Sequence, residues 1–188
     1  MKHLWIIIVI VLLIGSVLAT TFVYRNVKEQ ERLAAILSFE DCAKEAGVIQ
    51  ESYPPVCRTS DGRSFTQDIG NELEKLEIIR VSNPRPNQTI LSPLLVSGEA
   101  RGNWFFEGSF PVKLLDEEDN VLAQGVAETP GEWMTTEFIP FSVTLSFPMP
   151  KSGKGELLLE KSNPSGLPEN ADELRVPFFF SNALQLLR

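Results

Sequence analysis

The sequence is poor in histidine, which limits the chemistry that the chain can perform. Its single histidine, His3, lies near the N-terminus, ahead of a long apolar run. A Ser-His-Asp or Cys-His catalytic arrangement and a histidine-based metal site all need this residue beside their other members. Paired carboxylates for glycoside hydrolysis stay formally open, but no pattern marks two of them as opposed in a cleft. We therefore predict that the chain is not an enzyme and uses no cofactor or metal.

Cysteine is also scarce, since Cys42 and Cys57 are the two in the chain. Two thiols are too few for a structural zinc site. Disulfides persist in oxidising compartments outside the cytoplasm, so we predict that these cysteines pair there. A disulfide that closes a loop of about 15 residues stabilises a fold by about 3 kcal/mol. Free thiols or a bridge between two chains are the alternatives at this point.

Basic residues are outnumbered by acidic ones. The chain has 17 Lys and Arg against 25 Asp and Glu, and its formal net charge at pH 7 is −8. All of the acidic residues follow Lys28. Nucleic acids and anionic lipid surfaces are bound through basic patches. The charge balance therefore predicts no nucleic-acid partner and an acidic, solvated surface.

One long apolar segment is present, from Leu4 to Tyr24, and it contains no charged residue. At about 1.5 Å per residue, a helix of this length reaches about 31 Å, enough for a hydrocarbon core of about 30 Å. We predict that residues 1–25 form a single-pass membrane anchor. The flanking charges barely orient it, but the cysteine pair favours a cytoplasmic N-terminus and an extracytoplasmic remainder. The alternative is a signal peptide cleaved near Ala19, which would leave a secreted protein.

The residues after the apolar segment predict a stalk and then a small folded unit. Residues 26–37 contain strong helix formers without Gly or Pro, so we predict a helical stalk. Residues 38–70 are expected to form a small disulfide-tied helix-hairpin unit. Within it, Ser38 followed by Asp41 predicts the start of a short helix, and Gly47 predicts its C′ residue.

The stretch YPPVCRTSDGRSF at residues 53–65 predicts two short strands joined by an Asp-Gly turn. It resembles the cysteine-turn stretch of Kazal-type protease inhibitors, with its Tyr, its Pro-Val-Cys, its Asp-Gly and its aromatic residue. The resemblance implies protease inhibition as an alternative function. Kazal-type inhibitors are held by three disulfides, whereas this chain has cysteines for one, so the reactive loop would lack its scaffold.

Beyond residue 77 the pattern changes to short strands separated by turns rich in Pro, Gly, Asn and Asp. Strands at this spacing within residues 78–181 predict an all-β fold, an antiparallel immunoglobulin-like β-sandwich. Residues 71–77 are expected to be a linker and residues 182–188 a C-terminal tail. The expected strands cover residues 78–81, 94–98, 105–115, 121–128, 137–147, 155–161 and 174–180.

Apolar and polar side chains alternate in these strands, which predicts one buried and one solvated face. In the strand at 105–115 the apolar face comprises Phe106, Phe110, Val112 and Leu114. In the strand at 137–147 it comprises Phe141, Val143, Leu145 and Phe147.

Residues 78–181 resemble the Gmad-type immunoglobulin-like domain, a bacterial family associated with spore germination. The motifs that carry the resemblance are SPLLVSGEARGNWFFE at 92–107, FPV at 110–112, EWMTTEFIPF at 132–141, NPSG at 163–166 and VPF at 176–178. The resemblance implies a β-sandwich without catalytic activity. The turn at 116–120 departs from the family, which usually has an Asp and a Gly there. This acidic turn also lacks the ligand spacing of a calcium loop, so we predict a solvated hairpin tip.

Four residues in the strongest motifs are candidates for a partner surface, because Arg and aromatic residues are enriched where proteins bind one another. These residues also have a structural interpretation, in which Trp104 is buried and Arg101 pairs with Glu107 or caps a strand end. Trp133, in the corner before the next strand, has the same two interpretations. The candidate partner surface thus comprises Arg101, Trp104, Glu107 and Trp133.

Together these features predict a non-catalytic binding or scaffolding module of the bacterial cell envelope. It would be held at the membrane by the segment from Leu4 to Tyr24 and displayed outside the cytoplasm. Its expected partner is a cell-envelope protein or a wall component. The family resemblance implies a connection with germination. A fold by itself does not fix a function, so this connection rests on the resemblance alone.

Overall fold

The computed structural model describes residues 2–45, 47–148 and 153–181. Within the N-terminal helix, the side chains of residues 2–4 and 6–11 lie outside this description. The chain divides into two compact units, Met1–Gln67 and Asp68–Arg188, and each is described by itself.

The first unit begins with helix α1, Lys2–Ala34. The predicted anchor and stalk are thus parts of one continuous helix, which ends three residues before the predicted end of the stalk. In the part of the chain that the structure describes, no helix is long and apolar enough to cross a membrane. The predicted span at 4–24 includes residues 4 and 6–11, whose side chains lie outside the described residues.

The remainder of the first unit is a short helix followed by a small antiparallel sheet. Helix α2, Phe39–Lys44, begins after Ser38, whose hydroxyl accepts a hydrogen bond from the Asp41 backbone N–H at 3.1 Å. The Asp41 carboxylate in turn accepts one from the Leu37 backbone N–H at 3.3 Å, so the predicted helix start is capped from both sides. Strands β1, β2 and β3 follow in the order β1-β2-β3, at Val48–Gln50, Val56–Arg58 and Ser64–Thr66.

The predicted disulfide is confirmed, and it explains a glycine. Cys42 and Cys57 are bonded and fully buried, and they form a small core with Ile36. Gly47 is not the C′ residue that we predicted, because the cap residue of α2 is Glu45, two positions earlier. A Cβ at Gly47 would instead lie 2.5 Å from both sulfur atoms. Position 47 therefore needs glycine because the backbone passes directly over the disulfide.

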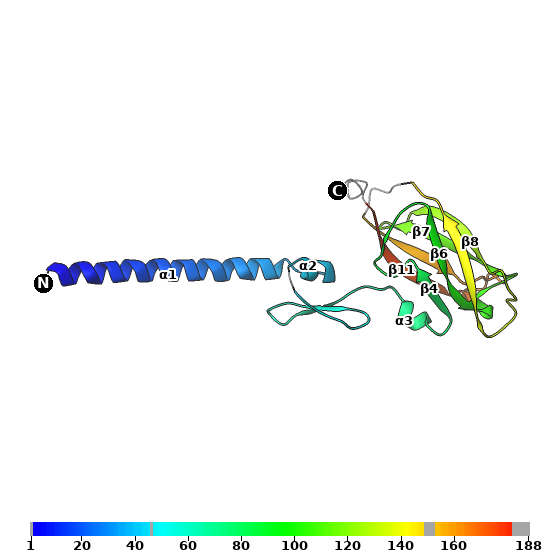
Figure 1. Cartoon of the computed structure of the whole chain (residues 1–188), viewed down its shortest axis with the longest axis horizontal. Helices are drawn as coiled ribbons and strands as arrows, with labels where there is room; N and C mark the ends of the chain where they lie inside the picture. The colour runs from blue at the N-terminus through cyan, green and yellow to red at the C-terminus, as the bar shows by residue number, and fades with distance from the viewer. Residues whose placement is uncertain (1, 46, 149–152, 182–188) are drawn as a thin grey trace. The chain divides into compact units, whose positions relative to one another are not determined.

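The second unit is a mostly β, sandwich-like fold, as predicted. Its eight strands form one curled sheet in the order β4-β6-β9-β8-β7-β10-β11-β5 (Figure 1). Strands β8 and β9 meet at a single pair, Glu128 and Ser142, so the sheet bends there and β4-β6-β9 closes over the other strands. The strands are β4 Ile79–Asn83, β5 Thr89–Ile90, β6 Leu94–Arg101, β7 Ser109–Asp116, β8 Val121–Glu128, β9 Phe138–Leu145, β10 Lys154–Glu160 and β11 Glu173–Phe180.

All seven expected strands are present, and the structure adds four short elements. Strand β5 pairs in parallel with the end of β11. Helix α3, Glu72–Lys75, occupies the segment that we predicted to be a linker and packs against β4 and β11. A 3₁₀ helix, Gly102–Trp104, follows β6, and a second one, Pro168–Asn170, precedes β11.

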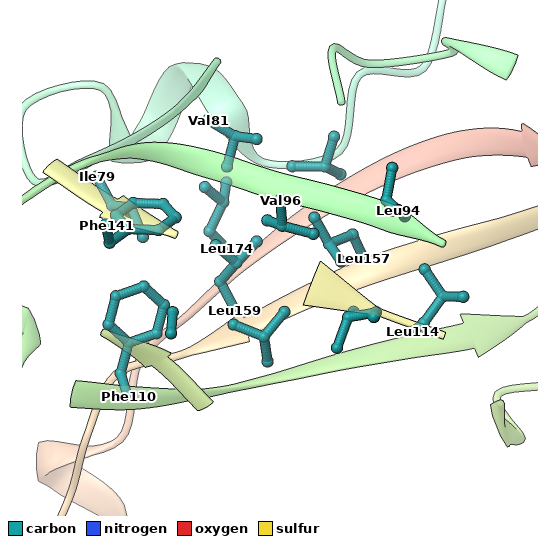
Figure 2. Packing of buried hydrophobic residues seen from close by; sticks show 14 of the residues in the cluster. Ile79, Val81, Leu94, Val96, Phe110, Leu114, Phe141, Leu157, Leu159 and Leu174 are labelled. Carbon is teal, nitrogen blue, oxygen red and sulfur yellow. The ribbon is translucent and has the colours of Figure 1, made fainter. Parts of the chain in front are cut away.

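The core lies between the two layers and follows the predicted alternation (Figure 2). Phe110, Val112 and Leu114 of β7 are buried, as are Phe141, Leu145 and Phe147. Val143 is only partly buried and packs against this core. Phe106 is an exception, because β7 begins at Ser109 and the Phe106 side chain is 43% exposed. The expected strand 105–115 is therefore too long at its start. Core residues labelled in Figure 2 are Ile79, Val81, Leu94, Val96, Phe110, Leu114, Phe141, Leu157, Leu159 and Leu174.

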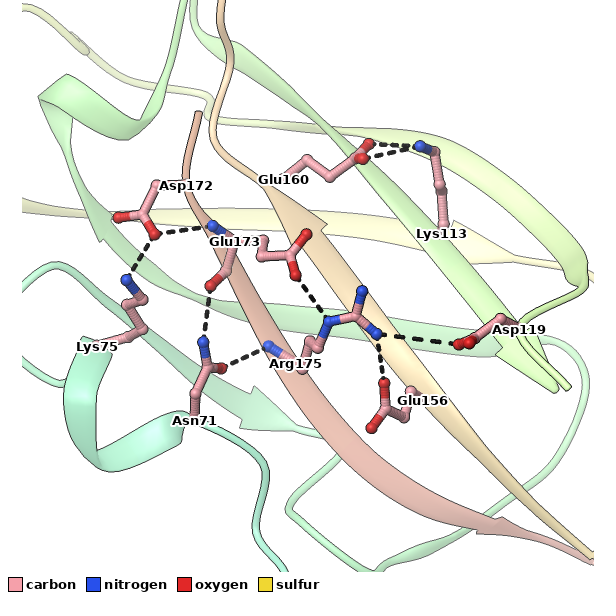
Figure 3. Close-up of polar contacts among 9 residues, drawn as sticks. All are labelled: Asn71, Lys75, Lys113, Asp119, Glu156, Glu160, Asp172, Glu173 and Arg175. Atoms are coloured by element: carbon pink, nitrogen blue, oxygen red, sulfur yellow. Dashed lines mark hydrogen bonds and ion pairs between the residues drawn. The ribbon is translucent and has the colours of Figure 1, made fainter. Parts of the chain in front are cut away.

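The outer edge of β11 is covered by two segments, one that precedes β4 and one that follows it. The Asn71 side chain bonds to the β11 backbone near its start (Figure 3). Further along, the Asn87 N–H donates to the Pro177 carbonyl at 2.7 Å, and the Phe179 N–H donates to the Gln88 carbonyl at 3.0 Å. An uncovered strand edge would offer backbone groups to other chains, so this cover protects the sandwich from edge-to-edge pairing.

An ion pair with one buried charge joins the two segments that cover β11. Glu72 of α3 is 1% exposed, and its carboxylate lies 2.6 Å from the guanidinium of Arg85. Arg85 also donates to the Val81 carbonyl at 2.7 Å. A buried carboxylate requires such a partner because desolvation of an unpaired charge is costly. The ion pair therefore ties α3 to the crossover between β4 and β5.

Candidate functional site

Most of the sequence-predicted surface residues gather at one end of the sandwich. There the end of β6 and the 3₁₀ helix Gly102–Trp104 meet the loop 129–137, which joins β8 to β9. A Cβ at Gly102 would lie 2.1 Å from the Thr135 carbonyl oxygen and 2.2 Å from that of Trp133. The loop is thus laid directly on the Gly102 backbone, and any larger residue there would displace it.

Arg101 fastens this loop to the sheet. Its Nε donates to the Glu77 carbonyl at 2.5 Å, and its Nη1 donates to the Thr136 carbonyl at 2.7 Å. The guanidinium also lies 4.3 Å from the centre of the Phe138 ring, over which Arg80 lies at 4.1 Å. These contacts use the planar fork and the face of the guanidinium. Arg101 therefore serves to position the loop, and its observed acidic neighbour is Glu77, at 3.9 Å, and not Glu107.

Trp104 lies in the core. Its side chain is fully buried and packs edge-on against Phe110, with 6.5 Å between ring centroids. Its carbonyl accepts a hydrogen bond from the Ser162 N–H at 3.0 Å. Within the described residues the buried indole Nε1 has no hydrogen-bond partner. Trp104 therefore offers no surface to a partner. Of its two predicted roles, the structural one in the core agrees with this burial.

Glu107 is exposed at a tight turn that directs Phe106 outward. The Phe106 and Ser109 backbones exchange two hydrogen bonds, at 3.0 and 3.1 Å. Glu107 and Gly108 between them take left-handed conformations, with φ of 52° and 72°. A Cβ at Gly108 would lie 3.4 Å from the Trp133 ring, so this ring lies over the turn. The turn and the loop 129–137 thus form one continuous surface.

An apolar patch occupies this surface, and we name it the Trp133 patch. Phe106 is 43% exposed and Met134 is 73% exposed, and the half-buried Trp133 lies against the same turn as Phe106. Beside them is an open hollow of about 560 Å³, which is lined by Gly102, Asn103, Trp133, Met134, Thr135 and Thr136. Neither Phe106 nor Met134 was among the residues predicted for the partner surface. The signal for Met134 is its place in a turn-rich loop directly after Trp133.

The two chain segments that form the Trp133 patch are rich in exposed acidic residues. Segments 101–109 and 128–137 contain four acidic residues and one basic residue, Arg101. All four carboxylates belong to exposed residues. They are Glu107, Glu128, Glu132 and Glu137. Because Arg101 is occupied by Glu77, Thr136 and Phe138, the rim of the patch carries net negative charge.

The outer face of β7, β10 and β11 is charged in a different way, with acids and bases paired (Figure 3). Arg175 lies 2.8 Å from both Glu156 and Glu173, and these hydrogen bonds, led by the one to Glu173, raise the pKa of its guanidinium. Two lysines on neighbouring elements are likewise paired with acids. These pairs are Lys113 with Glu160 at 2.8 Å and Lys75 with Asp172 at 2.5 Å. On this face each of these acids has a basic partner, so the face is an ion-pair network.

The acidic turn at 116–120 uses its first carboxylate to close the hairpin. Asp116 accepts hydrogen bonds from the Glu118 N–H at 3.0 Å and from the Asn120 N–H at 2.8 Å. Asp119 takes the left-handed conformation, with φ of 62°. Across the residues that the structure describes, no group of three or more His, Cys, Asp or Glu side chains could hold a metal ion.

The hairpin of the first unit uses its polar side chains to hold its own fold. Arg63 donates to the carbonyls of Leu33 and Ile36, at 2.5 and 3.0 Å, and so caps the end of α1. A hydrogen bond from the Thr59 hydroxyl, together with Arg63, keeps the pKa of the Asp61 carboxyl below its usual value. Tyr53, at the start of the Kazal-like stretch, is 52% exposed. Protease inhibition by this stretch stays a prediction.

Residues 78–166 match the family model Gmad2, the immunoglobulin-like domain of bacterial spore germination. The predicted family resemblance is therefore confirmed. The matched segment runs from the start of β4 to beyond β10, so it includes Arg101 and the whole loop 129–137. No curated protein and no solved structure shows a significant match to this chain.

Proposed function

We propose that this chain is a non-catalytic binding module that displays its Gmad2 domain outside the cytoplasm, where the Trp133 patch contacts a component of the cell envelope. The observation that carries the proposal is the exposure of two apolar side chains beside Trp133. Phe106 lies at the turn before β7, and Met134 lies on the loop fastened by Arg101 and Gly102. Isolated apolar residues on a surface are ordinary, whereas a cluster around a hollow marks an interaction site.

The fastened loop favours binding because it needs little ordering. Its first residues are held by the Thr129 N–H, which donates to the Gly108 carbonyl at 3.1 Å, and its last ones by Arg101. A preorganised surface loses less conformational entropy when a partner docks. The family itself is not known for catalysis, which agrees with a binding role.

The second part of the proposal is that the domain lies outside the cytoplasm. The uncharged segment at 4–24 would hold the chain at the membrane, or would direct export before cleavage near Ala19. The Cys42–Cys57 disulfide supports an oxidising, extracytoplasmic location for the rest of the chain. Membrane fractions washed at high salt and alkaline pH should retain the full chain. Its recovery in the cytoplasmic fraction with free thiols would contradict this part.

The binding role is tested by photo-crosslinking in cells. A photoreactive amino acid replaces Met134 in the full chain, and a matched chain carries it at Glu117, on the exposed hairpin tip. We expect a defined crosslinked product from position 134 that is absent from position 117. Equal products from both positions, or none from position 134, would contradict the proposed binding role.

A further inference from the structure

We infer that the Trp133 patch accepts a polypeptide segment in which an apolar side chain is flanked by lysine or arginine. This inference rests on the proposed function and deepens it, because it states the chemistry of the partner. It is drawn from three properties of the patch: its apolar centre, its unpaired acidic rim and its fixed backbone.

The centre of the patch suits one apolar side chain. Met134 is 73% exposed and borders the hollow together with Trp133. A flexible thioether and an aromatic ring adapt to an aliphatic or aromatic group, and burial of such a group supplies most of the affinity at a small interface. The exposed Asn103 and the residues Thr135 and Thr136 complete the lining of the hollow.

The rim of the patch suits positive charge. Within the described residues, no ion pair joins the carboxylates of Glu107, Glu128, Glu132 or Glu137 to a basic side chain. The acids on the face of β10 and β11 are, in contrast, paired with Arg175 and two lysines. Unpaired charges of one sign around an apolar centre attract a partner of opposite sign and repel phosphate-bearing partners. This asymmetry selects a cationic segment.

The backbone beneath the patch keeps these groups in a fixed arrangement. Gly102 lies under the carbonyls of Trp133 and Thr135, and Arg101 holds the Thr136 carbonyl. The Glu137 N–H donates to the Thr135 hydroxyl at 3.2 Å. Glu132 and Glu137 thus flank Trp133 and Met134 along a loop whose backbone is held in place. A short peptide with cationic residues on both sides of an apolar one matches this order of charge, apolar group and charge.

The test uses the full chain in non-ionic detergent with its methionine methyl groups labelled with carbon-13. Met134 reports on the patch, and a synthetic peptide Lys-Lys-Leu-Lys-Lys with blocked ends is the probe. We expect a saturable shift of the Met134 signal that weakens as sodium chloride is raised. The matched peptides Lys-Lys-Ser-Lys-Lys and Glu-Glu-Leu-Glu-Glu should bind at least about tenfold more weakly, since the first lacks the apolar group and the second the charge.

Two chain variants assign the binding to the patch. The double substitution E132K with E137K should weaken binding of the cationic peptide at least about tenfold. The matched control E117K with E118K reverses the same number of charges at the hairpin tip and should leave the affinity unchanged. Circular dichroism of each variant verifies the fold. If E132K with E137K unfolds the chain, the milder Glu132→Gln with Glu137→Gln takes its place.

Several results would overturn the inference. They are the absence of a Met134 shift with the cationic peptide, equal affinity in the patch and hairpin-tip variants, and tighter binding of the acidic peptide. A shift produced by wall glycan fragments in place of the peptide, or by self-association of the chain through Met134, would also overturn it. A crosslinked product from position 134 alongside a failed peptide test would leave the proposed function standing and remove the cationic partner.

Discussion

The side-chain amide of Asn71 pairs with the backbone of Arg175, which lies 104 residues away in the sequence. The Asn71 Oδ1 accepts from the Arg175 N–H at 2.8 Å, while its Nδ2 donates to the Glu173 carbonyl at 2.9 Å. One side chain thus replaces a neighbouring strand at the start of β11. The folded domain therefore begins before the first residue of the family match, at position 78.

Replacing Asn71 with Ala should destabilise the sandwich. The substitution leaves one backbone donor and one acceptor of β11 without a partner, and we expect a loss of about 1–3 kcal/mol. Urea unfolding of the full chain, followed by the fluorescence of the buried Trp104, measures the loss. Asn71→Asp keeps the acceptor and should still be destabilising, whereas Gln124→Ala, on the exposed side of β8, should be neutral. Equal stability of the Asn71→Ala and Gln124→Ala chains would show that the amide contributes nothing.

Replacing Gly47 with Ala should impair formation of the disulfide. The new Cβ would lie 2.5 Å from both sulfur atoms and 2.8 Å from the Cys42 carbonyl, so the backbone must move or the bond must open. Titration of free thiols in denaturant should find them in this variant and not in the parent chain. Gly153→Ala, at a position with open space around it, is the control. A fully oxidised Gly47→Ala chain with unchanged stability would contradict this explanation of the glycine.

Removing the disulfide by replacing Cys42 and Cys57 with Ser should destabilise the small unit by about 3 kcal/mol, as estimated for a closed loop of this length. The effect should be confined to residues 38–66. Hydrogen exchange would therefore rise in β2 and β3 and stay unchanged in β7 and β10. Reduction of the parent chain should reproduce the same pattern. Exchange that rises equally throughout both units would count against two separately stable bodies.

The stability of the small unit should decrease in acid. A hydrogen bond from the Thr59 hydroxyl holds the pKa of Asp61 low, and one from Ser38 does the same for Asp41. A lowered folded-state pKa gives stability that is present above the unfolded value of about 3.9 and is lost as the pH falls through the folded value. Hydrogen exchange of residues 53–66 should thus rise below about pH 4. Asp61→Asn should weaken the hairpin at pH 6 and reduce this pH dependence; an unchanged pH profile would contradict the assignment.

Replacing Arg101 with Lys should loosen the loop 129–137. A lysine ammonium cannot reproduce the planar fork that bonds to Glu77 and Thr136 and lies over Phe138. We expect faster hydrogen exchange in the loop and weaker crosslinking from position 134. Arg80→Lys is the matched control, because Arg80 also lies over Phe138 but bonds to Leu76 and Glu99 and not to the loop. The same loop exchange in both variants would mean that Arg101 has no special positioning role.

The sequence by itself determined seven of the eight strands of the sandwich and the pairing of the cysteines. The alternation at Phe110, Val112 and Leu114 predicts an inward face because side chains in a strand repeat every two residues. The two cysteines could be paired because the chain has no others. The ordered motifs in 92–141 also identified the domain family, since turns and strand ends depend on residues that are adjacent in the chain.

Only the tertiary structure decided which of these residues form a surface. Trp104 and Trp133 both lie next to turns, but the first is buried and the second rims a hollow with Met134. Phe106 continues the strand pattern yet is exposed, because the left-handed Glu107 and Gly108 turn the chain before β7. Local patterns record the periodicity of one segment. The neighbours of Asn71, Glu72 and Gly47 instead depend on contacts between different elements, which the folded chain alone brings together.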